Sequence, residues 1–124
     1  VWGDGSPIRD FIHADDVADG MISVIEQGYN KPINLGSGKG VTIKEIAEAI
    51  ACNMSDECKI IWDTSKPSGD KKRIMNTSRA ESIGIRPSIS LNEGIKTTIE
   101  WYQKNADNLS KRYNAFTDKL YKRN

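Results

Sequence analysis

Residues 2–20 read Trp-Gly-Asp-Gly-Ser-Pro-Ile-Arg-Asp-Phe-Ile-His-Ala-Asp-Asp-Val-Ala-Asp-Gly, and this stretch decides the fold. It joins a glycine-rich turn to a short apolar strand opened by an arginine, and then to a helix opened by an Asp-Asp pair. Gly3 and Gly5 lack a Cβ atom, so the backbone there can adopt positive φ and leave N–H groups free to face an anion. The Arg9 guanidinium stays ionised, and its planar fork of donors matches two phosphate oxygens. The stretch therefore predicts a phosphate-binding edge, with residues 11–12 anchoring the strand in a core.

The order of these residues resembles a motif of the extended short-chain dehydrogenases/reductases, the NAD(P)-dependent nucleotide-sugar epimerases and dehydratases. That motif reads W/Y-G-x-G-x-x-x-R-(D/E)-F-(I/L)-(H/Y)-x-x-D-(V/L)-A, and residues 2–18 match nearly every position. The resemblance implies that Arg9 binds the diphosphate of the substrate. It also implies that the turn carrying Trp2, Gly3 and Gly5 lies against the nucleotide.

Length and composition describe an ordinary globular protein. The chain has 124 residues, 37% of them hydrophobic, and a net charge of +1. This is about one domain, short for a two-lobed enzyme, and the balanced charge provides no field that would attract nucleic acid. No apolar run approaches about 18 residues and no signal peptide is present, so we expect a cytoplasmic protein without a membrane partner. The sequence begins inside the motif at Val1, which favours a segment of a longer protein.

Three single residues could carry chemistry but are interpreted as structural. Cys52 and Cys58 have no second pair to complete a zinc site, so reduced thiols and no metal are expected. His13 has no catalytic partner in the sequence pattern. An orienting or core role is therefore expected for its imidazole.

The first helix and the strand after it follow from periodicity and turn chemistry. Asp15 or Asp16 is the expected N-cap of a helix, and Gly28 is the left-handed residue that ends it. Residues 32–36 predict a short buried strand bounded by proline and glycine. The Gly-Ser-Gly-Lys-Gly turn that follows lacks phosphate-loop spacing, because Lys39 precedes a glycine instead of a hydroxyl residue.

Three capping boxes predict three further helix starts. The first helix carries one apolar stripe, the second is short and ends at Gly84, and the third is interrupted at residues 105–108. The capping pairs are Thr42 with Glu45, Ser78 with Glu81, and Ser90 with Glu93.

A second group of cations follows the strand predicted at residues 59–63. Residues 66–73 read Lys-Pro-Ser-Gly-Asp-Lys-Lys-Arg, with four cations in eight positions. Such a loop is either a solvated basic surface or, together with Arg9, a clamp on one polyanion.

The same segment resembles nucleotide-sugar reductases of the GDP-L-fucose synthase type, which read W/F-D-x-x-K-P-D-G-x-x-R-K-x-x-D-x-S-(R/K). Ser68 and Asn76 depart from that pattern, where aspartate is common, and this leaves the sugar or base preference open. The resemblance implies that Lys66, Lys72 and Arg73 contact the substrate. The matching residues are Trp62, Asp63, Lys66, Pro67, Gly69, Lys72, Arg73, Ser78 and Arg79.

The composition changes near the C-terminus. From residue 104 onward six cationic residues stand against two aspartates. Leu109, Tyr113, Phe116 and Leu120 recur at helical spacing, so residues 106–124 are predicted to form a basic amphipathic tail that docks on the body or on a neighbouring subunit.

Catalysis in this family needs a G-x-x-G-x-x-G turn for the cofactor and a Tyr-x-x-x-Lys pair for proton transfer. Neither is present, so no catalytic and no cofactor-binding residue is expected. The resemblance therefore identifies residues 1–105 as the C-terminal, substrate-binding portion of such an enzyme. It implies an α/β fold, with residues 11–12 and 33–35 at the edge of a Rossmann-type parallel sheet or in the small substrate lobe.

In this interpretation the fold is incomplete without an N-terminal cofactor-binding half. That half would bind NAD or NADP, none would be bound by this segment alone, and the intact enzyme is expected to be a homodimer. A nucleotide-diphosphate sugar is the implied substrate, with a GDP-sugar favoured. The alternatives are a UDP- or dTDP-sugar 4-epimerase or dehydratase, and a non-catalytic nucleotide-binding module or structural remnant.

Overall fold

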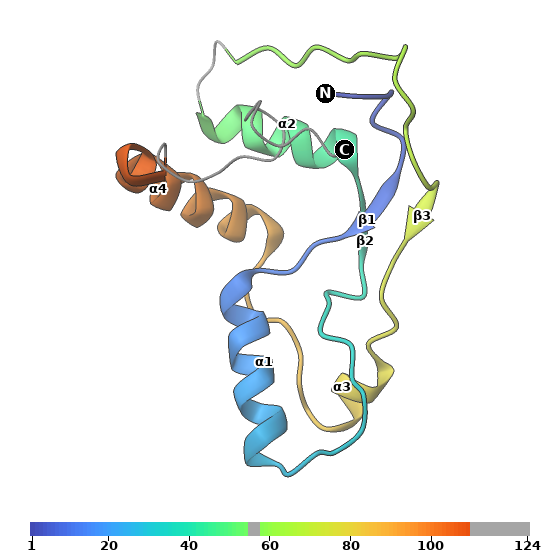
Figure 1. The fold of residues 1–124 in the computed structure, drawn as a ribbon, viewed down its shortest axis with the longest axis vertical. Helices are drawn as coiled ribbons and strands as arrows, with labels where there is room; N and C mark the ends of the chain where they lie inside the picture. Colours follow the sequence, from blue (N-terminus) through green and yellow to red (C-terminus); the bar gives the residue numbers. More distant parts are fainter. Residues whose placement is uncertain (55–57, 110–124) are drawn as a thin grey trace, which may run out of the picture.

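The computed structural model describes residues 1–54 and 58–109. Helices α2 and α4 pack against each other at one end, while α1 runs from the sheet toward the other end, where α3 lies (Figure 1). In these ranges the elements are β1 (Ile8–Asp10), α1 (Ala14–Glu26), β2 (Gly40–Thr42), α2 (Ile43–Met54), β3 (Lys72–Arg73), α3 (Ser78–Ser82) and α4 (Leu91–Leu109).

The three strands form one sheet in the order β2-β1-β3. β1 pairs with β2 antiparallel, with Arg9 opposite Val41. β1 pairs with β3 parallel, with Arg9 opposite Arg73. The sheet is therefore mixed, and only the β1–β3 pair has the expected parallel direction. The central position of β1 places Arg9 between two neighbouring strands.

The predicted strands differ from the observed ones. Residues 11–12 lie outside β1, because β2 pairs no further than Gly40, opposite Asp10. Residues 32–36 and 59–63 form no strand in the described part of the chain, apart from one isolated bridge between Trp2 and Asp63. An extended segment becomes a strand only when a neighbouring backbone pairs with it, and β1 is already paired on both sides.

Helix α1 begins two or three residues earlier than predicted, depending on whether Asp15 or Asp16 is taken as the expected cap. Its N-cap is His13, whose Nδ1 accepts a hydrogen bond from the Asp15 N–H at 3.2 Å, so neither aspartate is the cap. Asp16 is buried instead, and its carboxylate accepts bonds from the loop that precedes α4. The predicted end of the helix is confirmed, since Gly28 adopts φ 61° directly after the C-cap Gln27.

The first capping box is confirmed and the second is wrong. The Thr42 N–H donates to Glu45 Oε2 at 2.7 Å, and the Glu45 N–H donates back to Thr42 Oγ1 at 3.1 Å. The N-cap of α3 is Thr77, whose hydroxyl donates to Glu81 Oε1 at 2.6 Å. Ser78 lies inside the helix, where its hydroxyl donates to Asn76 Oδ1. Thr77 and Ser78 are adjacent hydroxyl residues, and the sequence pattern selected the wrong one.

Helix α4 begins with half of the third capping box and continues past the predicted interruption. The Glu93 N–H donates to Ser90 Oγ at 3.3 Å. The helix reaches Leu109, and within it the Asn105 side chain donates to the Trp101 carbonyl one turn back. Residues 106–109 of the predicted 106–124 tail belong to α4, and the rest of that tail lies outside the described residues.

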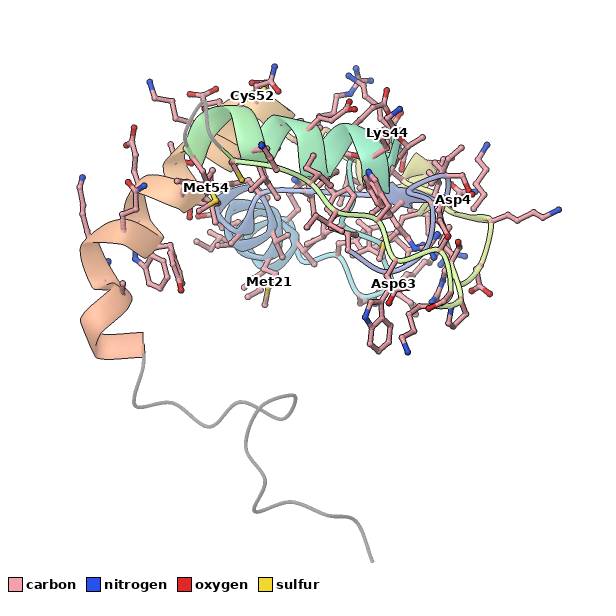
Figure 2. The ribbon with its side chains drawn as sticks, turned by 90° about the horizontal axis from the view of Figure 1, so that it is seen from above. Asp4, Met21, Lys44, Cys52, Met54 and Asp63 are labelled. Atoms are coloured by element: carbon pink, nitrogen blue, oxygen red, sulfur yellow. The ribbon has the colours of Figure 1, made fainter. Side chains whose placement is uncertain are left out.

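The apolar interior is thin in the part of the chain that the structure describes. Only Ala51 and Ala80 are buried hydrophobic residues there. Phe11, expected in a core, is 36% exposed, and on α1 the side chains of Met21, Ile22 and Ile25 are 57%, 54% and 77% exposed. Figure 2 shows Met21 pointing away from α2. One face of α1 is therefore apolar and has no cover from the described residues.

No helix in the described ranges is both long enough and apolar enough to cross a membrane.

Candidate functional site

Gly3 and Gly5 adopt positive φ as predicted, but the turn that they form packs against the chain itself. Gly3 and Gly5 adopt φ 80° and 78°. The Gly3 N–H donates to the Asp63 carbonyl at 2.9 Å, so the prediction of a free N–H at this position is wrong. A Cβ on Gly3 would lie 2.5 Å from Ser68 Oγ, and one on Gly5 would lie 2.6 Å from the Trp62 ring. The turn therefore packs tightly on residues 62–68.

Arg9 joins β1 to the cationic loop. Its Nη1 donates to the Ile8 carbonyl and to the Asp70 carbonyl, each at 2.8 Å. A Cβ on Gly69, which has φ 75°, would lie 3.5 Å from Arg9 Nη2, so the guanidinium lies against the loop backbone. These bonds use one of its two terminal nitrogens. Within the described ranges no protein acceptor bonds Nη2 or Nε of Arg9, so three of the five N–H donors of a guanidinium remain for a ligand.

Arg73 lies beside Arg9 in the parallel strand pair. Its Nε is 3.9 Å from Asp70 Oδ2, and both side chains of that pair are largely exposed. Asp70 therefore contacts both arginines, Arg9 through its carbonyl and Arg73 through its carboxylate. Lys72 is one position away on β3, and alternation along a strand places it on the opposite face of the sheet.

The remaining predicted site residues are Trp2 and Lys66, and the backbone of each pairs with the backbone of Asp63. Trp2 forms the isolated parallel bridge with Asp63, and its side chain is 69% exposed. The Lys66 N–H donates to the Asp63 carbonyl at 3.2 Å, while its ammonium is exposed. Asp4 and Asp63 lie at the end of the molecule opposite Met54 (Figure 2). The structure thus brings the turn and the loop together at one end.

Sequence reasoning missed Asp10, which organises the backbone next to Arg9. Its carboxylate accepts bonds from Ser37 N and Oγ at 2.8 and 2.5 Å, from Gly38 N at 3.0 Å and from Met75 N at 3.2 Å. Burial acts to raise the pKa of Asp10, but the hydrogen bonds outweigh it and hold that pKa below its ordinary value. The sequence feature that could have revealed this role is the Gly-Ser-Gly turn at residues 36–38, because its backbone N–H groups require a hydrogen-bond acceptor.

Asp16 ties α1 to the segment before α4 in the same way. Its carboxylate accepts from Ser88 N and Oγ at 2.8 and 2.9 Å and from Ile89 N at 3.1 Å. Burial favours the neutral form, yet these bonds, with a smaller contribution from His13, hold the pKa of Asp16 below its ordinary value.

His13 has the orienting and packing role expected from the sequence. Besides capping α1, its Nε2 lies 3.4 Å from Thr97 Oγ1 on α4. A Cβ on Gly94 would lie 3.1 Å from His13 Cδ2, so α4 approaches the imidazole closely at that glycine.

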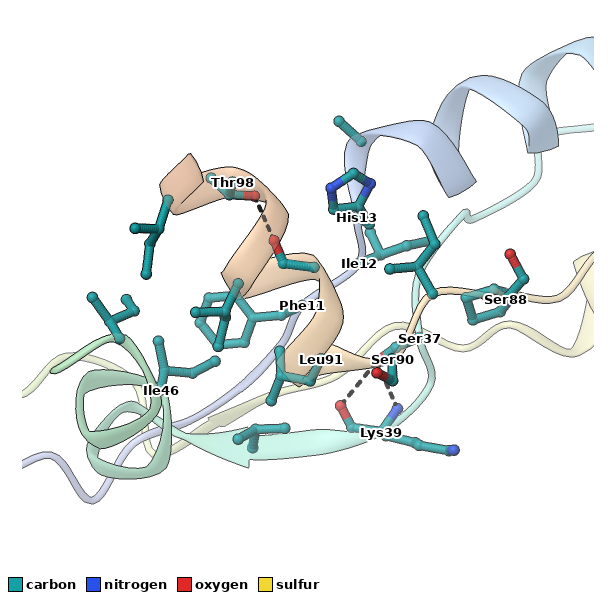
Figure 3. Close-up of a pocket in the computed structure, with 18 residues that line it drawn as sticks. Phe11, Ile12, His13, Ser37, Lys39, Ile46, Ser88, Ser90, Leu91 and Thr98 are labelled. Carbon is teal, nitrogen blue, oxygen red and sulfur yellow. Dashed lines mark hydrogen bonds between the residues drawn. The ribbon is translucent and has the colours of Figure 1, made fainter. Parts of the chain in front are cut away.

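A hollow of about 700 Å³ lies between α2, α4 and the chain that leaves β1 (Figure 3). Apolar side chains such as Phe11, Ile46 and Leu91 line most of it, and neither Arg9 nor Arg73 takes part. Its chemistry suits an apolar contact, so the candidate site for an anion is the Arg9–Arg73 edge. Among residues 1–54 and 58–109, no three His, Cys, Asp or Glu side chains group to hold a metal ion.

Comparisons with known proteins give concordant results. Residues 1–36 match the NAD dependent epimerase/dehydratase family. A protein described as putative GDP-L-fucose synthase 2 of Arabidopsis thaliana is 44% identical over 107 residues, which cover 85% of this chain and 32% of that protein.

Solved structures above 25% identity share the fold, and two of them serve as examples. UDP-glucose 4-epimerase of Thermotoga maritima, determined with UDP-glucose, has a TM-score of 0.76 and 29% identity over 86% of this chain and 35% of its own. GDP-mannoheptose C4 reductase of Campylobacter jejuni, with NADP bound, has a TM-score of 0.70 and 32% identity over 83% of this chain and 34% of its own. The chain spans about a third of the length of the curated relatives it matches.

Proposed function

Because this chain belongs to the NAD-dependent epimerase/dehydratase family, we propose that it is the substrate-binding part of an NAD(P)-dependent nucleotide-sugar epimerase/reductase. The substrate is a nucleotide-diphosphate sugar, and a GDP-sugar is favoured. Two relatives named for GDP-sugar chemistry, at 44% and 32% identity, support this preference. The observation that carries the proposal is the placement of Arg9 beside Arg73 in neighbouring parallel strands.

The physical argument begins with the geometry of the two arginines. Neighbouring strands lie about 4.8 Å apart, so directly paired side chains on one face can reach the same small polyanion. The Nη1 bonds of Arg9 fix its guanidinium and leave its other edge free, which reduces the ordering cost of ligand binding. Each charge-assisted bond to phosphate contributes roughly 1.5 to 3 kcal/mol. Exposed Lys66 adds positive charge around this site, Lys72 lies on the opposite face of the sheet and adds only to the overall positive potential, and Trp2, Gly3 and Gly5 shape the edge of the site.

The described residues do not fit a dinucleotide cofactor. A pyrophosphate binds at an uncapped helix N-terminus beside a glycine-rich turn. Here the first turn of α1 contains Asp15 and Asp16, and the N-terminus of α2 is satisfied by Glu45. The turn at Gly3 uses its N–H internally. We therefore assign no step of hydride transfer to this chain. In the proposal, NAD or NADP binds to a separate cofactor-binding half of the enzyme.

The uncovered face of α1 is the proposed contact with that half. Met21, Ile22 and Ile25 expose more than half of their surface there. The Leu35 side chain lies against the same helix, since a Cβ on Gly20 would be 3.0 Å from Leu35 Cδ2. Burying this face would stabilise the assembled protein by roughly 25 cal/mol of free energy for each Å² of apolar surface removed from water. A homodimer of the intact enzyme remains part of the proposal.

A UDP-sugar 4-epimerase is the second candidate, because the structural similarity to the Thermotoga enzyme is as high as that to the GDP-sugar reductase. A calorimetric titration of this chain with GDP, UDP and dTDP tests the choice. GDP should bind most tightly, and Arg9→Ala should weaken it about tenfold or more. Arg79→Ala is the matched control, because Arg79 donates to the Pro32 carbonyl away from the site. No binding of any nucleoside diphosphate would favour the structural-remnant interpretation.

A further inference from the structure

The Asp70 carboxylate lies within the proposed diphosphate site and carries a charge opposite to that of its neighbours. It is the single acid among residues 66–73, which contain four cations. Its Oδ2 faces Arg73 Nε at 3.9 Å, while its carbonyl accepts from Arg9. A ligand phosphate that binds Arg73 must approach this carboxylate closely.

Within the described residues, the Asp70 side chain accepts no hydrogen bond that would hold the backbone. Other aspartates near the site hold the backbone: Asp4 accepts from Ser6 N at 3.0 Å, and Asp63 accepts from Ser65 N at 3.1 Å. The Asp70 carboxylate accepts no such bond in the described ranges, and its side chain is 72% exposed. Only its carbonyl is structural, and any side chain at this position preserves that carbonyl. The carboxylate therefore acts through its charge.

We propose that Asp70 is a specificity-determining residue that competes with the ligand for Arg73 and lowers affinity in proportion to the ligand's negative charge. This inference rests on the proposed function of the Arg9–Arg73 edge. Like charges repel, so the carboxylate opposes a diphosphate more strongly than a monophosphate. The pair with Arg73 is exposed and weak, so the ligand can displace it. Asp70 thus limits how tightly a bare diphosphate is held.

The test compares two variants that each remove one exposed carboxylate facing one cation. Asp70→Asn keeps the carbonyl bond to Arg9, and Glu48→Gln removes the partner of Lys44 on α2, where the ions are 4.0 Å apart. The 124-residue chain is titrated with inorganic pyrophosphate, GDP and GMP at low salt, and circular dichroism checks that each variant keeps its helix content. Asp70→Asn should bind pyrophosphate and GDP about two- to fivefold more tightly and GMP with a smaller gain. Glu48→Gln should leave all three affinities unchanged.

Three results distinguish the inference from the function on which it rests. If Arg73→Ala leaves pyrophosphate affinity unchanged, the proposed diphosphate site itself is wrong. If Arg73→Ala weakens binding but Asp70→Asn behaves like Glu48→Gln, only the role of Asp70 is overturned. The gain from Asp70→Asn should also shrink in the Arg73→Ala chain, because residues that share a partner couple. A gain of the same size there would overturn the competition for Arg73.

Discussion

Arg9 of β1 and Arg73 of β3 are direct partners in a parallel strand pair, although they lie far apart in the sequence. Between them, Asp70 accepts a bond from Arg9 through its carbonyl and faces Arg73 through its carboxylate. Two like charges are thus held side by side by the backbone of the sheet. Arg9 keeps N–H donors that no described protein acceptor bonds, and Arg73 is exposed beside it, which is why we interpret this edge as an anion-binding site.

The two arginines should act on one ligand. In the intact enzyme, Arg9→Ala and Arg73→Ala are each expected to raise the Kd for a nucleoside diphosphate about tenfold or more, because each removes charge-assisted bonds. The double variant should lose less than the product of the two effects, since residues that share a ligand couple. Calorimetry measures all three constants. Two strictly independent effects would place the arginines at separate sites.

This chain alone should neither oxidise NADPH nor bind it. The described helix N-termini carry acidic residues, and the sequence has no cofactor fingerprint. A fluorescence titration with NADPH, followed by an absorbance assay with GDP- and UDP-sugars, checks both expectations. Saturable binding of NADPH to the purified 124-residue chain would contradict the assignment of the cofactor to another half.

The uncovered face of α1 should make the chain self-associate. Ile25 is 77% exposed on this face, and Ile25→Glu should shift the population toward the monomer. Ile61→Glu is the matched control, because Ile61 is 78% exposed but lies on a different segment. Analytical ultracentrifugation over a concentration series measures the shift. A wild-type chain that stays monomeric at every concentration would show that the exposed face is tolerated.

Stability should fall in acid because Asp10 and Asp16 have lowered pKa values in the folded state. The stability they contribute is complete above the ordinary aspartate pKa of about 3.9 and is lost as the pH falls through the lower folded-state values. Urea unfolding should therefore give a nearly constant free energy down to about pH 5 and a decline below about pH 4. Asp10→Asn should cost about 1 to 3 kcal/mol at neutral pH and make the acid decline shallower. An unaltered pH profile in that variant would show that Asp10 does not contribute.

Gly5 should be intolerant of a side chain for two separable reasons. Gly5→Ala adds strain at φ 78° and a contact of 2.6 Å with the Trp62 ring. Gly28→Ala adds strain alone, because no atom lies within 4 Å of a Cβ at that glycine, which has φ 61°. Strain costs roughly 1 to 2 kcal/mol, so the free energy of unfolding should fall more for Gly5→Ala than for Gly28→Ala. Equal losses would mean that Trp62 moves aside without cost.

Local features of the chain could be read from the sequence because they depend on neighbouring residues. The Thr42–Glu45 capping box, the left-handed Gly28 and the positive φ of Gly3 and Gly5 were all predicted correctly. The predicted cap was wrong by two or three residues at His13, whose Nδ1 accepts from the Asp15 N–H, and by one residue at Thr77, which is adjacent to Ser78. The match of residues 1–36 to the NAD dependent epimerase/dehydratase family likewise followed from residue order, since the motif at residues 2–18 is contiguous.

Only the tertiary structure decided which backbone groups pair and where the charges meet. Residues 32–36 have a strand-like sequence, but they form no strand because no backbone in the described part of the chain pairs with them. The Gly3 N–H, open to a ligand on sequence grounds, is taken by the Asp63 carbonyl. Two further features depend on residues that are distant in the sequence. The parallel pairing of β1 with β3 sets Arg9 beside Arg73, and the Asp10 carboxylate accepts a hydrogen bond from the Ser37 N–H. Sequence determines the residues and their local conformations, whereas long-range hydrogen bonds, which no local pattern encodes, determine their neighbours.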